Sequence, residues 1–187
     1  MFFKKVENLE KYENSNDWGK AINLLYNNWE EDKDNPDKLL RLATECWYVL
    51  TEWEFLTINK VELNKEFVKQ KLIKTYSDVN LKFSNNDKVL VMFGYMISLF
   101  PFYFYDSNDV TEETFLKYEN IGKEMLKKAF EINSTDYINK LLYLGSSNQI
   151  QKDLIANKKD FKQVVDSYFS QNTEIERYFT EVLTKEQ

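Results

Sequence analysis

Two carboxylates at helical spacing are the side chains best placed to do acid–base chemistry. Glu45 and Glu52 fall on one side of a predicted helix, two turns and roughly 10 Å apart, which is close to the separation of the carboxylate pair in inverting glycosidases. Arg41 precedes Glu45 by one turn, so these side chains can equally form an ion pair on a solvated helix face. We favour the ion pair and predict that the protein is not an enzyme. A carboxylate-based enzyme remains the third interpretation of its function.

The sequence offers few residues for other kinds of catalysis or for metal binding. The chain has no histidine and a single cysteine, Cys46, whereas histidine is the commonest general base and a common ligand of transition metals. Without a histidine to activate it, the Cys46 thiol is expected to be a small buried apolar group. The acidic run 32–37 lacks the central glycine and distal glutamate of a calcium loop, and no glycine-rich phosphate-binding motif occurs. The sequence therefore predicts no metal and no cofactor.

Composition and charge restrict the partner. The chain has 187 residues, 43% of them hydrophobic, and a net charge of −6, with arginine only at positions 41 and 177. Nucleic-acid binding usually requires a basic, arginine-rich face, so we expect no nucleic-acid partner. An acidic surface suits a basic protein partner, because opposite charges speed the encounter.

One uncharged run raises the question of a membrane. Residues 89–105 carry no charge, but the run is slightly short for a span and contains Pro101. We expect a buried helix followed by an aromatic loop and no membrane contact. The start of the chain does not have the charge order of a signal peptide, and a single cysteine fits a reducing compartment. The sequence therefore predicts a cytoplasmic protein.

The apolar residues recur at three- and four-residue steps along nearly the whole chain, which is typical of helices. With only 4 glycines and 2 prolines, a fold of many tight β-turns is disfavoured. The predicted helices cover about 3–12, 17–33, 37–55, 64–82, 86–100, 111–131, 135–145, 149–157 and 161–183. The aromatic run 100–105 either forms an exposed patch or folds back under the helices.

Three helix junctions repeat at a spacing of about 50 residues. They lie near 33–37, 83–87 and 132–136, and each opens a helix with matching apolar positions. A fixed period in this range indicates stacked helical hairpins that bury a shared core. We therefore predict an all-α fold: a single domain, residues 1–187, of about eight helices stacked as antiparallel hairpins, with a C-terminal capping helix.

Residues 17–50 resemble a tetratricopeptide repeat. An aromatic residue precedes an Ala-Ile pair in 17–22, an acidic, proline-containing junction occupies 34–37, and Leu42-Ala43 follows in the next helix. The chain departs from the family in its period, which is near 50 instead of about 34. The resemblance implies tetratricopeptide-like hairpins that bind a protein or peptide, and it implies no catalysis.

A second resemblance is to a class of proteins. In its small size, acidic charge and lack of a catalytic signature, the chain is similar to bacterial immunity proteins. This implies a non-catalytic protein that binds and neutralises a cognate, basic, nuclease-type toxin domain, as in contact-dependent inhibition. The alternative is a general adaptor or regulator that holds a peptide in the concave groove of its hairpins.

Two groups of side chains are predicted to contact the partner. One helix of each stacked hairpin lines the concave side, and tyrosine and arginine are favoured at interfaces. The first group is the polar stripe of the helix at 37–55, which consists of Arg41, Glu45, Tyr48 and Glu52. The second group is the acidic segment before that helix, which consists of Glu30, Glu31, Asp32 and Asp34.

Overall fold

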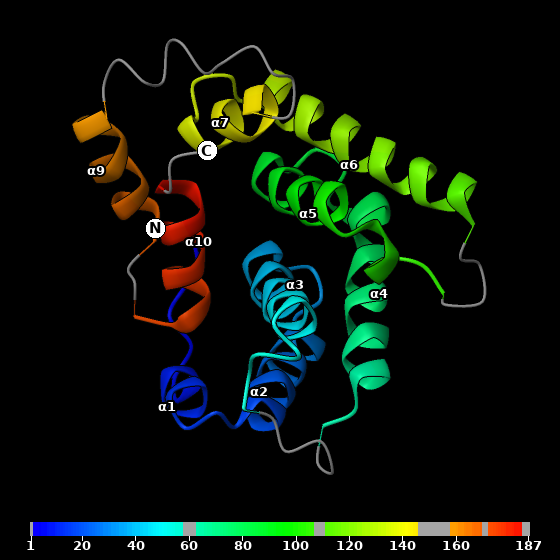
Figure 1. The fold of residues 1–187 in the computed structure, drawn as a ribbon, viewed down its shortest axis with the longest axis vertical. Helices are drawn as coiled ribbons and strands as arrows, with labels where there is room; N and C mark the ends of the chain where they lie inside the picture. The colour runs from blue at the N-terminus through cyan, green and yellow to red at the C-terminus, as the bar shows by residue number, and fades with distance from the viewer. Residues whose placement is uncertain (1, 58–62, 107–110, 146–157, 170–171, 185–187) are drawn as a thin grey trace. The chain divides into compact units, whose positions relative to one another are not determined.

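The computed structural model describes residues 2–57, 63–106, 111–145, 158–169 and 172–184, and within these ranges the chain is helical, without strands. This confirms the all-α fold (Figure 1). The α-helices are α1 (Leu9–Asn14), α2 (Trp18–Glu30), α3 (Pro36–Thr51), α4 (Lys65–Lys82), α5 (Asp87–Leu99), α6 (Glu112–Ile132), α7 (Tyr137–Gly145), α9 (Lys158–Tyr168) and α10 (Glu174–Thr184), and a 3-10 helix, η1, spans Pro101–Tyr103.

The three predicted junctions share one hydrogen-bonded geometry. At each, a polar residue caps the second helix: Oδ1 of Asn35 accepts from the N–H of Asp37, Oδ1 of Asn86 from that of Val89, and Oδ1 of Asp136 from that of Asn139. The N–H of each cap donates in turn to the carbonyl three residues before it. Such caps satisfy N–H groups that a helix start leaves without partners. The caps lie about 50 residues apart, which agrees with the spacing of the junctions in the sequence.

The chain divides into two compact units. Unit 1 consists of Met1–Val68 and Gln151–Gln187, and unit 2 consists of Lys69–Ile150. The described parts of unit 1 contain α1, α2, α3, α9 and α10, whereas unit 2 contains most of α4 together with α5, η1, α6 and α7. Unit 1 is therefore built from both ends of the chain. The single domain predicted for residues 1–187 stays a prediction.

Helix α3 is the centre of unit 1. All its residues from Leu39 to Leu50 are buried, because α2 packs against it and α10 contacts both α3 and α1 (Figure 1). The N-terminal residues Phe2 and Phe3 join the same core. Their rings stack or tilt against those of Phe169 and Phe179 at centroid distances of 5.6 to 6.2 Å.

Two glycines set the closest helix packing in unit 2. Helices α5 and α6 meet at Gly94 and Gly122, where a Cβ on Gly94 would lie 2.9 Å from the Gly122 carbonyl oxygen and one on Gly122 would lie 2.6 Å from the Ser98 nitrogen. These distances fall on backbone atoms, which no side-chain rotation can move away. The glycines therefore let the two backbones approach more closely than any larger residue would.

Several predicted boundaries differ from the structure. The single helix predicted over 161–183 is wrong: α9 ends at Tyr168 and α10 begins at Glu174, with Thr173 accepting from the N–H of Glu176 at the start of α10. The first helix begins at Leu9 instead of near residue 3, because Phe2 and Phe3 are drawn into the aromatic core of unit 1. The helix predicted at 149–157 lies outside the described residues. Among the described helices, none has the length and apolar character needed to span a membrane.

Candidate functional site

The polar stripe of α3 is buried. Arg41 is 2% exposed, Glu45 0% and Tyr48 8%, and only Glu52, the residue that follows α3, keeps intermediate exposure. The expectation of a solvated groove wall is therefore wrong for the first three side chains. The physical reason is that Glu13 of α1 and Tyr178 of α10 pack against the side of α3 on which these side chains lie. A repeat pattern cannot predict this packing, because it concerns segments outside the repeat.

Arg41 is held between two carboxylates that come from different helices. Its Nη2 atom donates to Oε1 of Glu13 at 2.6 Å and lies 3.3 Å from Oε2 of Glu45. Glu45 stands one turn after Arg41 on α3, and Glu13 lies in the last turn of α1. The second oxygen of Glu13 accepts the backbone N–H of Glu174, the first residue of α10. This Glu13–Arg41–Glu45 cluster therefore connects α1, α3 and α10.

Burial governs the protonation of the cluster. Burial, together with the negative charge of Glu13, raises the pKa of Glu45 to about 8, against the opposing effect of the Arg41 guanidinium. Burial also raises the pKa of Glu13, against the opposing effect of Arg41. In a desolvated site, one guanidinium can balance the charge of only one of the two carboxylates that face it. The cluster is neutral overall when the two carboxyls hold one proton between them.

The hydrogen bonding of the cluster points to the same protonation. Among the residues that the structure describes, neither oxygen of Glu45 has a donor in hydrogen-bonding geometry and Nη1 of Arg41 has no acceptor. Both carboxyls approach the same Nη2 atom of Arg41, at 2.6 and 3.3 Å, so a proton on Glu45 would turn that carboxyl into a donor toward Glu13. The Arg41 guanidinium also lies over the ring of Phe3, 5.3 Å from its centroid. These contacts hold the guanidinium in the interior of unit 1.

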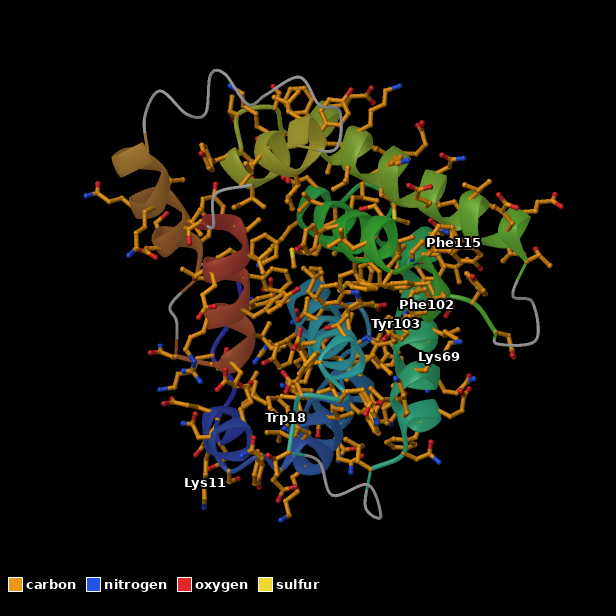
Figure 2. All side chains as sticks on the ribbon, viewed as in Figure 1. Lys11, Trp18, Lys69, Phe102, Tyr103 and Phe115 are labelled. Carbon is orange, nitrogen blue, oxygen red and sulfur yellow. The ribbon has the colours of Figure 1, made fainter. Side chains whose placement is uncertain are left out.

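Tyr48 belongs to an aromatic contact instead of a binding groove. Its ring lies 5.6 Å from that of Trp18 and 5.4 Å from that of Tyr178 on α10, and Figure 2 labels Trp18 in this unit. Burial and the nearby charges of Glu174 and Glu52 raise the pKa of Tyr48 above its usual value. Trp47, which precedes it, packs against Tyr178 and Phe179. α10 thus occupies the side of α3 predicted to hold a partner.

The acidic segment before α3 is exposed as predicted. Glu30, Glu31, Asp32 and Asp34 all lie on the surface at the turn between α2 and α3. Lys33 bridges to Glu30 at 3.0 Å and Lys38 to Asp32 at 3.7 Å, so the segment carries more acid than base at one turn. The structure therefore brings these four residues together at the surface, separate from the buried stripe.

The aromatic run 100–105 combines both predicted outcomes. Phe104 and Tyr105 are buried in unit 2, where Phe104 contacts Tyr76 and Phe93. Phe102 is 38% exposed, and its ring packs on that of Tyr103 at 4.5 Å. Figure 2 labels these two residues of η1 and also Phe115, near the start of α6, which is exposed to the same extent. The run folds under its own unit and leaves part of its surface to solvent.

The sequence did not indicate Glu13 as a member of the cluster, nor Glu174 as the residue whose N–H donates to it. Glu13 lies in a short polar segment with nothing to distinguish it from its neighbours. The available signal is Arg41, because the chain has two arginines and its other basic residues are lysines. Arginine is the preferred cation for buried ion pairs, because its planar guanidinium matches carboxylate geometry. That preference indicates a buried partner without saying which one.

The cluster has the features of a structural tie more than of a reaction centre. Its carboxylates and its guanidinium are almost fully removed from solvent, so a substrate has no direct access to them. Within the described ranges no group of three or more Cys, Asp or Glu side chains is placed to hold a metal ion. What the cluster can do chemically is retain a proton.

The functional inference for this chain rests on its own sequence and structure. No protein-family model, curated protein or solved structure matches the chain.

Proposed function

We propose that this protein is a non-catalytic binding protein whose partner is a basic protein, contacted through the acidic α2–α3 turn. The observation that carries the proposal is the exposure of Glu30, Glu31, Asp32 and Asp34 at one turn, in a chain of net charge −6. Both features favour a positively charged surface on the partner.

The structure around the turn supports a rigid contact surface. Oδ1 of Asn35 accepts from the N–H groups of Asp37 and Lys38, and its Nδ2 donates to Asp32 at 3.1 Å. The helices on both sides are anchored in the core by Trp29 and Leu39. A surface held in this way loses little conformational freedom on binding, which favours affinity.

In its sharper form, the proposal is an immunity protein that neutralises a nuclease-type toxin domain. A nuclease needs a basic surface to hold its nucleic-acid substrate. An acidic turn that covers this surface would block the substrate by charge and by steric exclusion, without any chemistry on the toxin. Inhibition would then be stoichiometric, with one bound copy silencing one toxin domain.

The test begins with the partner itself. Co-purification from the native host followed by mass spectrometry identifies the bound protein, and titration of the purified pair measures its Kd at several salt concentrations. We expect a basic partner, an affinity that falls with salt, and, if the partner cleaves nucleic acid, loss of cleavage at equimolar ratio. A partner without a basic surface, or binding that does not respond to salt, would contradict the proposal.

A matched pair of variants then locates the surface. Neutralising the four acids of the turn (Glu30→Gln, Glu31→Gln, Asp32→Asn and Asp34→Asn) should weaken binding at least tenfold and reduce its salt dependence. The control neutralises four exposed acids of α6, namely Glu112, Glu113, Glu124 and Glu131, which changes the net charge equally. Equal weakening by both variants would show that total charge, and not the turn, drives binding.

The two other interpretations lose part of their support. Arg41, Glu45 and Tyr48 were predicted to contact the partner in the immunity and adaptor interpretations alike, and their burial by the chain's own helices leaves the adaptor without these groove residues. The carboxylate enzyme was predicted to use Glu45, whose side chain has no solvent exposure.

A further inference from the structure

We propose that the attachment of α10 to α1 and α3 is a proton-controlled latch, in which one proton held between Glu13 and Glu45 keeps both carboxyls and Arg41 buried together. The proposal concerns how unit 1 is held closed. It stands independently of the partner proposed above.

The geometry places the cluster at the point where three segments meet. Glu13 comes from α1, whereas Arg41 and Glu45 come from α3. The Glu13 carboxylate also accepts the N–H of Glu174, where the positive end of the α10 dipole favours an anion. Moving α10 away would leave that carboxylate oxygen without its donor and open the cluster to water.

The charges in the cluster do not balance without a proton. Glu13, Arg41 and Glu45 are all at most 2% exposed, and one guanidinium can neutralise only one carboxylate. The second carboxyl must stay protonated or carry an unbalanced charge in a low-dielectric site, which is strongly unfavourable. Within the described residues neither oxygen of Glu45 receives a hydrogen bond, although Nη2 of Arg41 lies 3.3 Å from Oε2, so a shared proton is the means by which the two acids are joined.

The surrounding groups on each element do not supply the missing positive charge. On α10, the charge of Glu174 opposes ionisation of Glu13, and that of Arg177 favours it. These two side chains are themselves paired at 2.8 Å. On α3, Tyr48 faces Glu45, Glu13, Glu174 and Glu52 and stays neutral, since its pKa is raised. From the N-terminal segment, the cluster receives the uncharged ring of Phe3.

The direction of the pH effect follows from linkage. In the latched state the pKa of Glu45 is raised from its ordinary 4.5 to about 8, and in the released state the carboxyl reaches water. The released state therefore binds fewer protons than the latched state between these values, and rising pH favours release. The latch is fully stabilised below the ordinary value, weakens as the pH rises through the neutral range, and stops weakening above about 8.

Hydrogen exchange of the α10 amides measures the latch directly. Protection factors, corrected for the intrinsic exchange rate, are followed by mass spectrometry at several pH values from 5 to 9, with the α5 and α6 amides of the same molecule as an internal reference. In the wild-type protein we expect the opening constant of α10 to rise by up to about tenfold per pH unit below pH 8, because one proton is released on opening. The α5 and α6 amides should not follow it.

Three variants separate the shared proton from other causes. Glu45→Gln places a neutral amide, which can donate to Glu13 as the protonated carboxyl would, so the pH dependence should disappear and the latch should stay closed at pH 8. Glu13→Gln leaves one acid with one base and should flatten the profile in the same way. Glu181→Gln makes the same chemical change at an exposed position of α10 and should keep the wild-type profile.

Four results would overturn the proposal. These are a flat wild-type profile, a slope that survives in Glu45→Gln, a change in unit 2 that matches the change in α10, and failure of Glu45→Gln to fold at pH 7. The last result counts against it because a neutral amide should replace the protonated carboxyl. Loss of the profile in Glu181→Gln would show instead that general surface charge controls the helix.

Discussion

At the scale of single residues, Arg41 shows how a side chain of a type favoured at interfaces can serve the interior. A helical stripe of Arg, Glu, Tyr and Glu is typical of an exposed binding face, yet its first three members are buried. The guanidinium satisfies Glu13 by a 2.6 Å hydrogen bond and approaches Glu45. Burial of such a group is tolerated only while its partners are present.

Arg41→Met should therefore be strongly destabilising, because it leaves two buried carboxyls without a cation. We expect a loss of about 3 to 5 kcal/mol of unfolding free energy, the range for removing one partner of a buried ion pair, measured by urea denaturation. The triple variant Glu13→Gln/Arg41→Met/Glu45→Gln removes the charges together and should recover more than half of that loss. An Arg41→Met protein as stable as the wild type would show that the cluster carries no unbalanced charge.

Gly94 and Gly122 show a second effect at the residue scale: the close approach of two helix backbones leaves no room for a Cβ atom. Gly94→Ala places a methyl group 2.9 Å from backbone atoms of Gly122 and Leu126, so α5 and α6 must separate. We expect a loss of about 1 to 3 kcal/mol, as for other overpacked sites. Thermal or urea unfolding of unit 2 measures it, followed by hydrogen exchange of α5 and α6.

Gly19→Ala is the control for that prediction. Gly19 also lies in a helix, but a Cβ there meets nothing within 4 Å. Alanine should raise stability by roughly 0.5 to 1 kcal/mol, since it restricts the unfolded chain and favours the helix. If Gly94→Ala and Gly19→Ala shifted stability in the same direction, close backbone packing would not be the reason for Gly94.

At the scale of elements, the three helix junctions share one capping arrangement. Asn35, Asn86 and Asp136 each accept from an N–H of the helix they precede, and their own N–H groups donate to a carbonyl just after the end of the preceding helix. Three segments with different sequences therefore form similar capped turns. It also makes each cap separately testable.

Asn86→Ala should remove the cap of α5 and reduce the stability of unit 2 by about 1 kcal/mol, the usual cost of losing an N-cap. Asn86→Ser keeps a side-chain oxygen at that position and should lose less. Urea midpoints of the two variants measure the difference. Equal loss in both would mean that the Asn86 side chain contributes by some route other than its bond to the Val89 N–H.

The helices were largely predictable from the sequence, whereas the buried Glu13–Arg41–Glu45 cluster was not. Periodicity and caps placed α2 to α6 within a few residues, because both signals are local. The burial of Glu45 depends on α1 and on α10, which lie far from it in the sequence. The junction acids Glu30 to Asp34 were predictable as exposed, because a turn between capped helices lies at the surface. Local patterns therefore predicted the helices and turns of each hairpin. Packing between segments distant in the sequence determined which polar side chains stay exposed to solvent.

At the scale of the whole molecule, unit 1 depends on segments from both ends of the chain. The N–H of Phe2 donates to the carbonyl of Tyr168, and the rings of Phe2, Phe3, Phe169 and Phe179 form one group. Unit 2 lies between these segments in the sequence and has its own core. The two units should therefore respond differently to the loss of the C-terminal helices.

Ending the chain at residue 157 should loosen unit 1 and spare unit 2. Without α9 and α10, Phe3 and Trp47 lose aromatic partners, so apolar surface becomes exposed in α1 to α3. We expect faster amide exchange in those helices and stronger binding of a hydrophobic dye. Exchange in α5 and α6 should change little, which serves as the control. Unchanged protection of α3 would show that α10 is dispensable for its burial.

The joining of distant segments also orders events during synthesis. A ribosome releases α1, α2 and α3 first, but the rings that cover Phe3 and Trp47 belong to residues 169 to 179 and emerge only after more than a hundred further residues. Unit 2 ends at Ile150, 19 residues before Phe169 (169 − 150), and at that point the aromatic side of the first hairpin is still open. The nascent protein thus exposes the aromatic side of its first hairpin until residues 169 to 179 have been synthesised.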